Sequence, residues 1–250
     1  MRKNPTTLSE LLANLTRQLP LLLGRNLVGI YLYGSVTNSA FNPNTSDVDC
    51  IVVTKRDVTD AQFRKLDRWL TETAQSNSWM PRSQIIFLIR DEVLTMNSKA
   101  CLYQFGVLKR TGSDGNPIIW LDYLRSGKVL FGPPPESFLP KITEEILLEA
   151  LKRELGYLRQ EIIETPNSEW RDVPMYRAYA VLTVCRILYS FNKGEIVSKS
   201  TAAKWAIRNL PGRWREIIEQ ALDYNQTGRE SGIPLKGLQQ FVRFGISRVR

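Results

Sequence analysis

Residues 33–53 read YGSVTNSAFNPNTSDVDCIVV, and this stretch decides how the first half of the chain folds. It places Gly34 and Ser35 after one apolar run, and Asp47 and Asp49 at the head of another. Two apolar runs on either side of a polar loop predict two strands of one sheet. Two carboxylates one residue apart on such a strand need a chemical reason, because like charges at short range repel each other.

A metal ion is the simplest reason for this pair. On a strand, residues two apart point to the same face and lie about 6.6 Å apart, so Asp47 and Asp49 would stand side by side. Mg²⁺ prefers oxygen ligands, and a pair of such ions can stabilise the attacking and leaving oxygens in nucleotidyl transfer. Gly34 lets the backbone approach a phosphate, while Ser35 and Ser46 offer hydroxyl groups. The pattern predicts a site for two Mg²⁺ ions and a nucleoside triphosphate.

The composition excludes several classes of enzyme. The chain of 250 residues contains no histidine. Catalytic triads, cysteine–histidine pairs, histidine-bound zinc and imidazole bases are therefore excluded. The three cysteines, Cys50, Cys101 and Cys185, are odd in number and far apart, so we expect buried thiols in place of disulfides or zinc pairs. Catalysis must use carboxylates, lysine, tyrosine or a metal held by oxygen atoms.

The net charge is +9, from 34 basic and 25 acidic residues, and the sequence pI is about 9.6. Such a balance attracts polyanions, which include nucleotides and nucleic acids. No run of five basic residues occurs, so we expect the charges to be spread over helix surfaces and do not expect nucleic acid as the partner. No apolar stretch is long enough to cross a membrane and the N-terminus lacks a signal peptide pattern, which predicts a cytoplasmic protein.

The first half of the chain alternates between helix and strand patterns. Leu8, Leu11 and Leu15 recur at helical spacing, and Thr59 with Gln62 forms a capping box ahead of a second helix. Apolar runs of strand length surround the second helix. We expect helices over 6–24 and 59–75, and strands over 26–34, 48–54, 83–90 and 128–132. This mixture predicts an α+β domain with a small mixed sheet.

Residues 131–140 read FGPPPESFLP and mark a domain boundary, because consecutive prolines fix φ and remove hydrogen-bond donors. We place the first domain at 1–131, a proline-rich linker at 132–140 and a second domain at 141–250. The second domain carries only helical patterns, which predict a bundle of four or five helices. The expected helices are 146–162, 175–194, 201–211, 211–225 and 235–249.

These motifs resemble those of the DNA polymerase β-like nucleotidyltransferases, whose signature is Gly-Ser followed by Asp-x-Asp. More closely, the chain resembles the aminoglycoside adenylyltransferases that act on streptomycin and spectinomycin. The similar segments are LYGSVTNSAF, SDVDCIVV, YQFG, VLFGP and the helical VLTVCRILYSFNKGEIVSKSTAAKWAIRNLP, and they extend over nearly the whole chain. The later segments are the more specific part, since many nucleotidyltransferases share the first two.

The resemblance implies roles for residues in both domains. It implies that Asp47 and Asp49 bind Mg²⁺, with Ser35 and Ser46 near the phosphates of ATP. It also implies that the helical domain supplies two cations and a tyrosine to the nucleotide, so that ATP would bind in a cleft between the domains. These residues are Arg186, Lys199 and Tyr224, although Asn225 occupies the ungapped position of the tyrosine.

The resemblance also exposes a departure on the third strand. The family carries a glutamate there, as a metal ligand and as the base that takes the proton from the drug hydroxyl, whereas this chain has Gln84 in RSQIIFLIRDE. An amide oxygen can contact a metal, but an amide cannot accept a proton at neutral pH. Loss of the base costs roughly 10² to 10⁴ in rate. Asp91 would lie about 23 Å further along an extended strand and is a poor substitute.

Three explanations of Gln84 remain open. The protein has lost its activity, or it uses another base such as water or another carboxylate, or glutamate was replaced deliberately to hold ATP unreacted. Glutamine is nearly isosteric with glutamate, so a deliberate replacement would stop the chemistry and keep the shape of the site.

The resemblance implies a small cationic antibiotic as the acceptor of AMP, and resistance to that antibiotic as the result. Glu169 and Asp172 are the candidate drug-binding carboxylates, with Trp170 as a ring platform. Streptomycin-using members carry a tryptophan where this chain has residues 165–167, and an aromatic residue where it has Leu108. These departures favour spectinomycin over streptomycin. The expected enzyme is a monomer that transfers AMP from ATP to a drug hydroxyl with the help of Mg²⁺.

Two other functions remain open on the sequence alone. A nucleotidyltransferase that modifies protein or RNA would benefit from the basic surface. A catalytically silent ATP-binding module, such as an antitoxin, would be compatible with Gln84. Drug-dependent release of pyrophosphate would separate the antibiotic enzyme from both.

Overall fold

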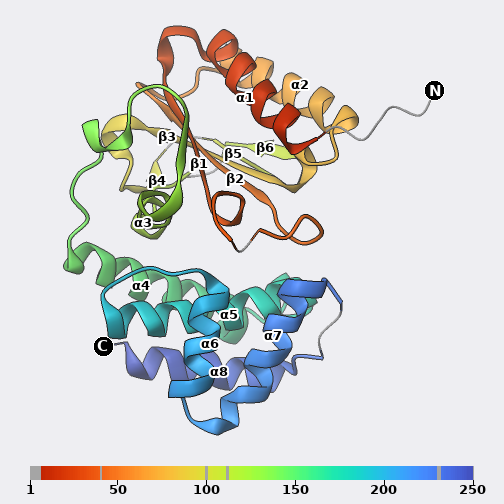
Figure 1. The fold of residues 1–250 in the computed structure, drawn as a ribbon, viewed down its shortest axis with the longest axis vertical. Helices are drawn as coiled ribbons and strands as arrows, with labels where there is room; N and C mark the ends of the chain where they lie inside the picture. The colour runs from red at the N-terminus through yellow and green to blue at the C-terminus, as the bar shows by residue number, and fades with distance from the viewer. Residues whose placement is uncertain (1–6, 40, 99–100, 111–112, 230–231, 250) are drawn as a thin grey trace. The chain divides into compact units, whose positions relative to one another are not determined.

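The computed structural model describes residues 7–39, 41–98, 101–110, 113–229 and 232–249, and the chain divides into two compact units (Figure 1). The first unit comprises Met1–Phe41 and Ser46–Lys141, and the second comprises Asn42–Thr45 and Ile142–Arg250. The proline-rich segment 132–140 therefore groups with the first unit. The grouping of Asn42–Thr45 with the helical half was not expected from the sequence.

The first unit is built on a mixed six-stranded sheet with the order β6-β5-β3-β2-β1-β8. Only β2 and β3 run parallel, and every other neighbouring pair in this sheet is antiparallel. Its strands are β1 (Leu27–Tyr33), β2 (Val48–Thr54), β3 (Ser83–Ile89), β5 (Leu102–Gln104), β6 (Val107–Lys109) and β8 (Lys128–Phe131). A separate pair consists of β4 (Met96–Ser98) and β7 (Ser113–Asp114). The predicted α+β fold with a mixed sheet is confirmed.

Helices α1 (Leu8–Leu23) and α2 (Asp60–Ser76) lie together over one face of the sheet, and α3 (Pro117–Ser126) lies on the other face (Figure 1). Thr7 caps α1, and the predicted capping box of Thr59 and Gln62 is present at the start of α2. Helix α3 was not expected from the sequence, because GNP precedes it and its apolar run is short. Asn116 caps it, and Pro117 occupies its first position.

The two faces of the strands have different partners. Ile30, Cys50 and Phe87 point into the main apolar core with the leucines of α1 and α2. The alternate residues point the other way, and Tyr31 there contacts Trp120 in edge-to-face geometry at 6.0 Å between ring centroids. Burial of all three cysteines is confirmed. It raises the pKa of the Cys50 thiol to about 12, which keeps this thiol protonated and unreactive.

The second unit is a bundle of five helices within the described residues, as predicted. They are α4 (Glu144–Arg159), α5 (Pro174–Lys193), α6 (Lys199–Asn209), α7 (Arg215–Thr227) and α8 (Leu235–Arg248). Helix α5 packs against the other four and is the most deeply buried. It ends at Gly194, whose φ of 70° is the left-handed conformation that glycine adopts readily.

Short helical turns connect these elements. They are η1 (Gly24–Asn26), η2 (Ser35–Thr37), η3 (Met80–Arg82), η4 (Arg90–Glu92), η5 (Pro135–Ser137), η6 (Gln160–Glu164), η7 (Glu169–Arg171) and η8 (Gly212–Trp214). Strand β2 begins at Val48, as expected, so Asp47 precedes it. The helix expected from residue 211 begins at Arg215, because η8 occupies the residues after Pro211. Among the described residues, no helix has the length and apolarity to span a membrane.

Candidate active site

The end of β1 and the starts of β2 and β3 meet at one edge of the sheet. In the strand register, Tyr33 pairs with Asp49, and Asp49 pairs with Gln84. These three residues therefore form one row across three adjacent strands, and paired side chains in a sheet point to the same face. Asp47 is exposed in the loop just before β2, so the predicted alternation along a strand applies to Asp49 but not to Asp47.

Gly34 is required by the position of the Asp49 carboxylate. Its φ is 75°, and a Cβ atom at this residue would lie 2.2 Å from Asp49 Oδ2. The turn that follows is fixed by its own hydrogen bonds, because the Gly34 carbonyl accepts from Thr37 Oγ1 at 2.8 Å and from Asn38 Nδ2 at 2.9 Å. Gly34 was predicted to let a phosphate approach the backbone. In the structure, the Asp49 carboxylate makes this close approach.

Ser35 presents a polar atom that the protein does not satisfy. Its Oγ is buried and has no hydrogen-bond partner among the described residues. Such an atom costs about 1–3 kcal/mol unless a ligand or water satisfies it. Ser46 is half-buried, and its carbonyl accepts a hydrogen bond from the Arg82 guanidinium. Arg82 also lies over the Trp79 ring, and this cation beside the predicted site was not expected from the sequence.

The donor atoms at this edge suit a hard cation. The carboxylates of Asp47 and Asp49 are oxygen ligands, which Mg²⁺ prefers. A third carboxylate is missing, since the described residues contain no group of three acidic, cysteine or histidine side chains placed to hold a metal. The unsatisfied Ser35 hydroxyl next to Gly34 fits a phosphate oxygen. These residues therefore fit Mg²⁺ and a nucleotide. They include one carboxylate fewer than the family that the sequence resembles.

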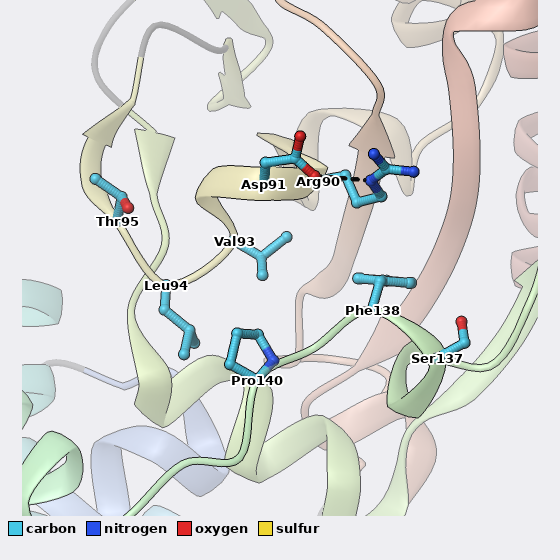
Figure 2. Close-up of a pocket in the computed structure, with 8 residues that line it drawn as sticks. All are labelled: Arg90, Asp91, Val93, Leu94, Thr95, Ser137, Phe138 and Pro140. Atoms are coloured by element: carbon cyan, nitrogen blue, oxygen red, sulfur yellow. Dashed lines mark hydrogen bonds and ion pairs between the residues drawn. The ribbon is translucent and has the colours of Figure 1, made fainter.

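Gln84 is half-buried and its Oε1 accepts a hydrogen bond from the Tyr33 hydroxyl at 3.3 Å. Asp91 does not compensate for the missing carboxylate. Strand β3 runs without interruption from Ser83 to Ile89, so Asp91 lies beyond its opposite end. There Asp91 pairs with Arg90 at 2.9 Å, on the rim of a pocket of about 500 Å³ whose lining includes Val93 and Phe138 (Figure 2).

The helical unit places Lys199 against Tyr179, and Arg186 two turns along the same helix as that tyrosine. Lys199, the first residue of α6, holds its Nζ 3.5 Å from the centroid of the Tyr179 ring. Arg186 lies half-buried on α5, seven residues after Tyr179 and so on the same face of that helix two turns along. Tyr224 lies half-buried on α7, and the carbonyl of the neighbouring Asn225 accepts from Thr45 Oγ1 at 2.9 Å.

The predicted drug contacts lie on the short turn η7 and at its end. Glu169 and Asp172 are exposed there, as a cation-binding role requires. The Trp170 ring is less open than a platform would be, because Tyr176 stacks on it with centroids 5.0 Å apart and Tyr157 and Tyr179 approach it edge-on. The exposed rings of this cluster are those of Tyr157 and Tyr179, at 45% and 38%. Neither was predicted from the sequence.

Comparisons with known proteins agree with this architecture. The family of nucleotidyltransferase domains matches residues 16–100, and the family described as the aminoglycoside adenylyltransferase C-terminal domain matches residues 137–245. A crystal structure of the spectinomycin adenyltransferase AAD(9) from Enterococcus faecialis with ATP and spectinomycin superposes with a TM-score of 0.72. It is 19% identical and the match covers 95% of this chain and 98% of that one, so the fold is shared.

Curated relatives point to the same group of proteins. A spectinomycin 9-adenylyltransferase from Staphylococcus aureus is 29% identical over 216 residues, which cover 80% of this chain and 78% of the relative. An aminoglycoside (3'') (9) adenylyltransferase from Klebsiella pneumoniae is 26% identical over 262 residues, which cover 97% of this chain and 93% of the relative. Both similarities extend through the two units.

Proposed function

Since the chain belongs to the aminoglycoside adenylyltransferase family and is a nucleotidyltransferase, we propose that it transfers AMP from ATP to a hydroxyl of an aminocyclitol antibiotic. Spectinomycin is the preferred acceptor, because a relative just described is a spectinomycin 9-adenylyltransferase and the residues that favour streptomycin are replaced. The proposal includes a cytoplasmic monomer that confers resistance.

The proposal rests mainly on one feature of the sheet edge. The row of Tyr33, Asp49 and Gln84 brings a carboxylate to this edge beside Gly34 and the unsatisfied Ser35 hydroxyl. An oxygen-ligand site next to a buried donor that no described residue satisfies is what a metal-bound phosphate group requires.

The residues would have the following roles in AMP transfer. Asp47 and Asp49 would hold Mg²⁺, which supplies positive charge to the phosphates. The Ser35 hydroxyl would donate to a phosphate oxygen, and Ser46 would lie close to the same group. The drug hydroxyl attacks the α-phosphorus, a new P–O bond forms, and the bond to the β-phosphate breaks to release pyrophosphate. The hydroxyl proton needs an acceptor, and the amide of Gln84 cannot be that acceptor.

The second unit is proposed to serve both substrates. Arg186, Lys199 and Tyr224 are the candidates for nucleotide binding by resemblance. Exposed Glu169 and Asp172 are proposed to bind the cationic drug, since carboxylates attract its ammonium groups. The role of Trp170 is proposed to be structural support for Tyr157 and Tyr179, whose exposed rings remain accessible to a ligand.

The test is incubation with ATP, Mg²⁺ and either spectinomycin or streptomycin, with the product identified by mass spectrometry. The chain with Gln84 is compared with Gln84→Glu, and Asp49→Asn in the Gln84→Glu background is the negative control. We expect Gln84→Glu to be faster than the chain with Gln84 by roughly 10² to 10⁴. Equal and substantial rates would show that position 84 is not the base, and absence of product from both would contradict the proposed reaction.

Gln84 favours a second candidate function, a module that binds ATP without transferring AMP. Calorimetric titration of the chain with Gln84 with Mg²⁺ and ATP separates the two. Tight binding without product, and without gain on Gln84→Glu, would support the silent module over the antibiotic enzyme.

A further inference from the structure

Tyr33 lies between the apolar interior and the candidate site. It is the last residue of β1, and it is only 6% exposed. Its backbone pairs with Asp49, whose backbone in turn pairs with Gln84 on β3. The tyrosine is therefore fixed both by the sheet and by burial.

The Tyr33 hydroxyl on β1 reaches past β2 to the side chain of Gln84 on β3. It donates to Gln84 Oε1 at 3.3 Å, so the one amide atom of this side chain that can accept a hydrogen bond is turned toward β1. The Nε2 group then forms the other end of the planar amide. Because Tyr33 is buried, water competes poorly for its hydroxyl, and the contact can hold the side chain in one orientation.

We infer that Tyr33 is a positioning residue that fixes which atom of the side chain at position 84 faces ATP and the acceptor hydroxyl. In this chain that atom is the amide Nε2, a donor suited to a phosphate oxygen. With glutamate at position 84, Tyr33 would bind one carboxylate oxygen and leave the other for the acceptor proton. The inference rests on the proposed function for what faces position 84, but the Tyr33–Gln84 contact itself does not.

A direct role of Tyr33 as the base is less consistent with its chemistry. A phenol has a pKa near 10 and is protonated at neutral pH, so it gives a hydrogen bond more readily than it takes a proton. The hydroxyl therefore acts through Gln84.

The first test needs neither ATP nor drug. In the chain with Gln84 labelled with ¹⁵N-glutamine, the Gln84 amide signals are identified by their loss in Gln84→Glu, and ¹⁵N relaxation gives their order parameter. We expect Tyr33→Phe to lower this order parameter, toward the values below about 0.6 that mark flexible groups. Tyr31→Phe is the matched control, because Tyr31 lies two residues earlier on the same face and donates to Pro133 O at 2.9 Å.

The second test uses the Gln84→Glu chain and measures kcat and KM for AMP transfer separately. Tyr33 is proposed to orient the side chain at position 84 and not to bind ATP or the drug. Tyr33→Phe should therefore lower kcat by roughly tenfold with KM unchanged, whereas Tyr31→Phe should change neither.

The outcomes separate the positioning role from the proposed function. An order parameter that Tyr33→Phe does not change overturns the positioning role, whatever the activity. An unchanged kcat for active Gln84→Glu with and without Tyr33→Phe overturns it as well. A lower order parameter in Tyr33→Phe, combined with no AMP transfer by Gln84→Glu, supports the positioning role and contradicts the proposed function.

Discussion

The two faces of the central sheet carry opposite kinds of side chain on the same strands. On β2, Cys50 and Val52 enter the main core, while Asp49 faces the other way. Strand alternation lets one strand stabilise the fold with one set of residues and hold a charged site with the other. Stability and chemistry in this unit should therefore be separable by mutation, residue by residue.

The largest expected effect is on the site face. Asp49→Asn in the Gln84→Glu background should lower kcat/KM by about 10³-fold or more, since the metal is worth several kcal/mol of transition-state stabilisation. The melting temperature should stay the same or rise. Asp91→Asn is the control, because Asp91 lies past the far end of β3. Equal losses in both variants would contradict the location of the site.

On the core face, Phe87→Ala should cost about 3–5 kcal/mol of unfolding free energy, because a fully buried ring leaves a cavity. Urea denaturation measures this loss. In the Gln84→Glu background, Phe87→Ala should leave the rate of AMP transfer per folded molecule unchanged. A catalytic loss beyond the unfolded fraction would show that the two faces are coupled.

Gly34→Ala is expected to lower both the stability and the binding of ATP, so stability and chemistry would not be separable at this residue. The strained φ costs about 1–3 kcal/mol, and the new Cβ must displace the Asp49 carboxylate. Mg²⁺-dependent ATP binding should fall with stability. Gly106→Ala is the matched control, because Gly106 has a φ of 79° but an added Cβ atom would meet no other atom within 4 Å. Retained ATP binding in Gly34→Ala would argue against a site at Asp49.

The smallest effect should come from the start of α2. Thr59→Ala removes the cap that accepts from Gln62 N at 3.3 Å and should cost about 1 kcal/mol of stability. AMP transfer by the Gln84→Glu chain should be unaffected, because α2 covers the core face. Thermal unfolding and a rate assay on the same sample measure both quantities, and a changed rate at unchanged stability would contradict this assignment.

Local patterns were predictable because local chemistry determines them. The Thr59 capping box, the stop at Gly194 and the apolar strands were all visible in the sequence, and the structure contains each. Helix α3 was missed because its pattern is short. The strand over 48–54 was predicted correctly, but the alternation of Asp47 with Asp49 does not apply, because Asp47 lies in the loop before β2.

The candidate site was predictable only in part. Gly34, Ser35 and Asp49 were singled out as candidates because their spacing is itself the signal. The contacts of Tyr33 with Gln84 and of Lys199 with Tyr179 join residues distant in sequence, and register or helix packing sets them. The packing of Trp170 among three tyrosines was missed for the same reason, since one helix alone supplies only two of those rings.

The Tyr33–Gln84 contact has a consequence for the evolution of this gene. A carboxylate at position 84 needs no new shape, because it can accept from the same hydroxyl as the amide. In the genetic code, either glutamine codon becomes a glutamate codon by one change of its first base. Growth under spectinomycin should therefore select that single substitution first, and a host carrying this gene would stand one point mutation from a faster transferase.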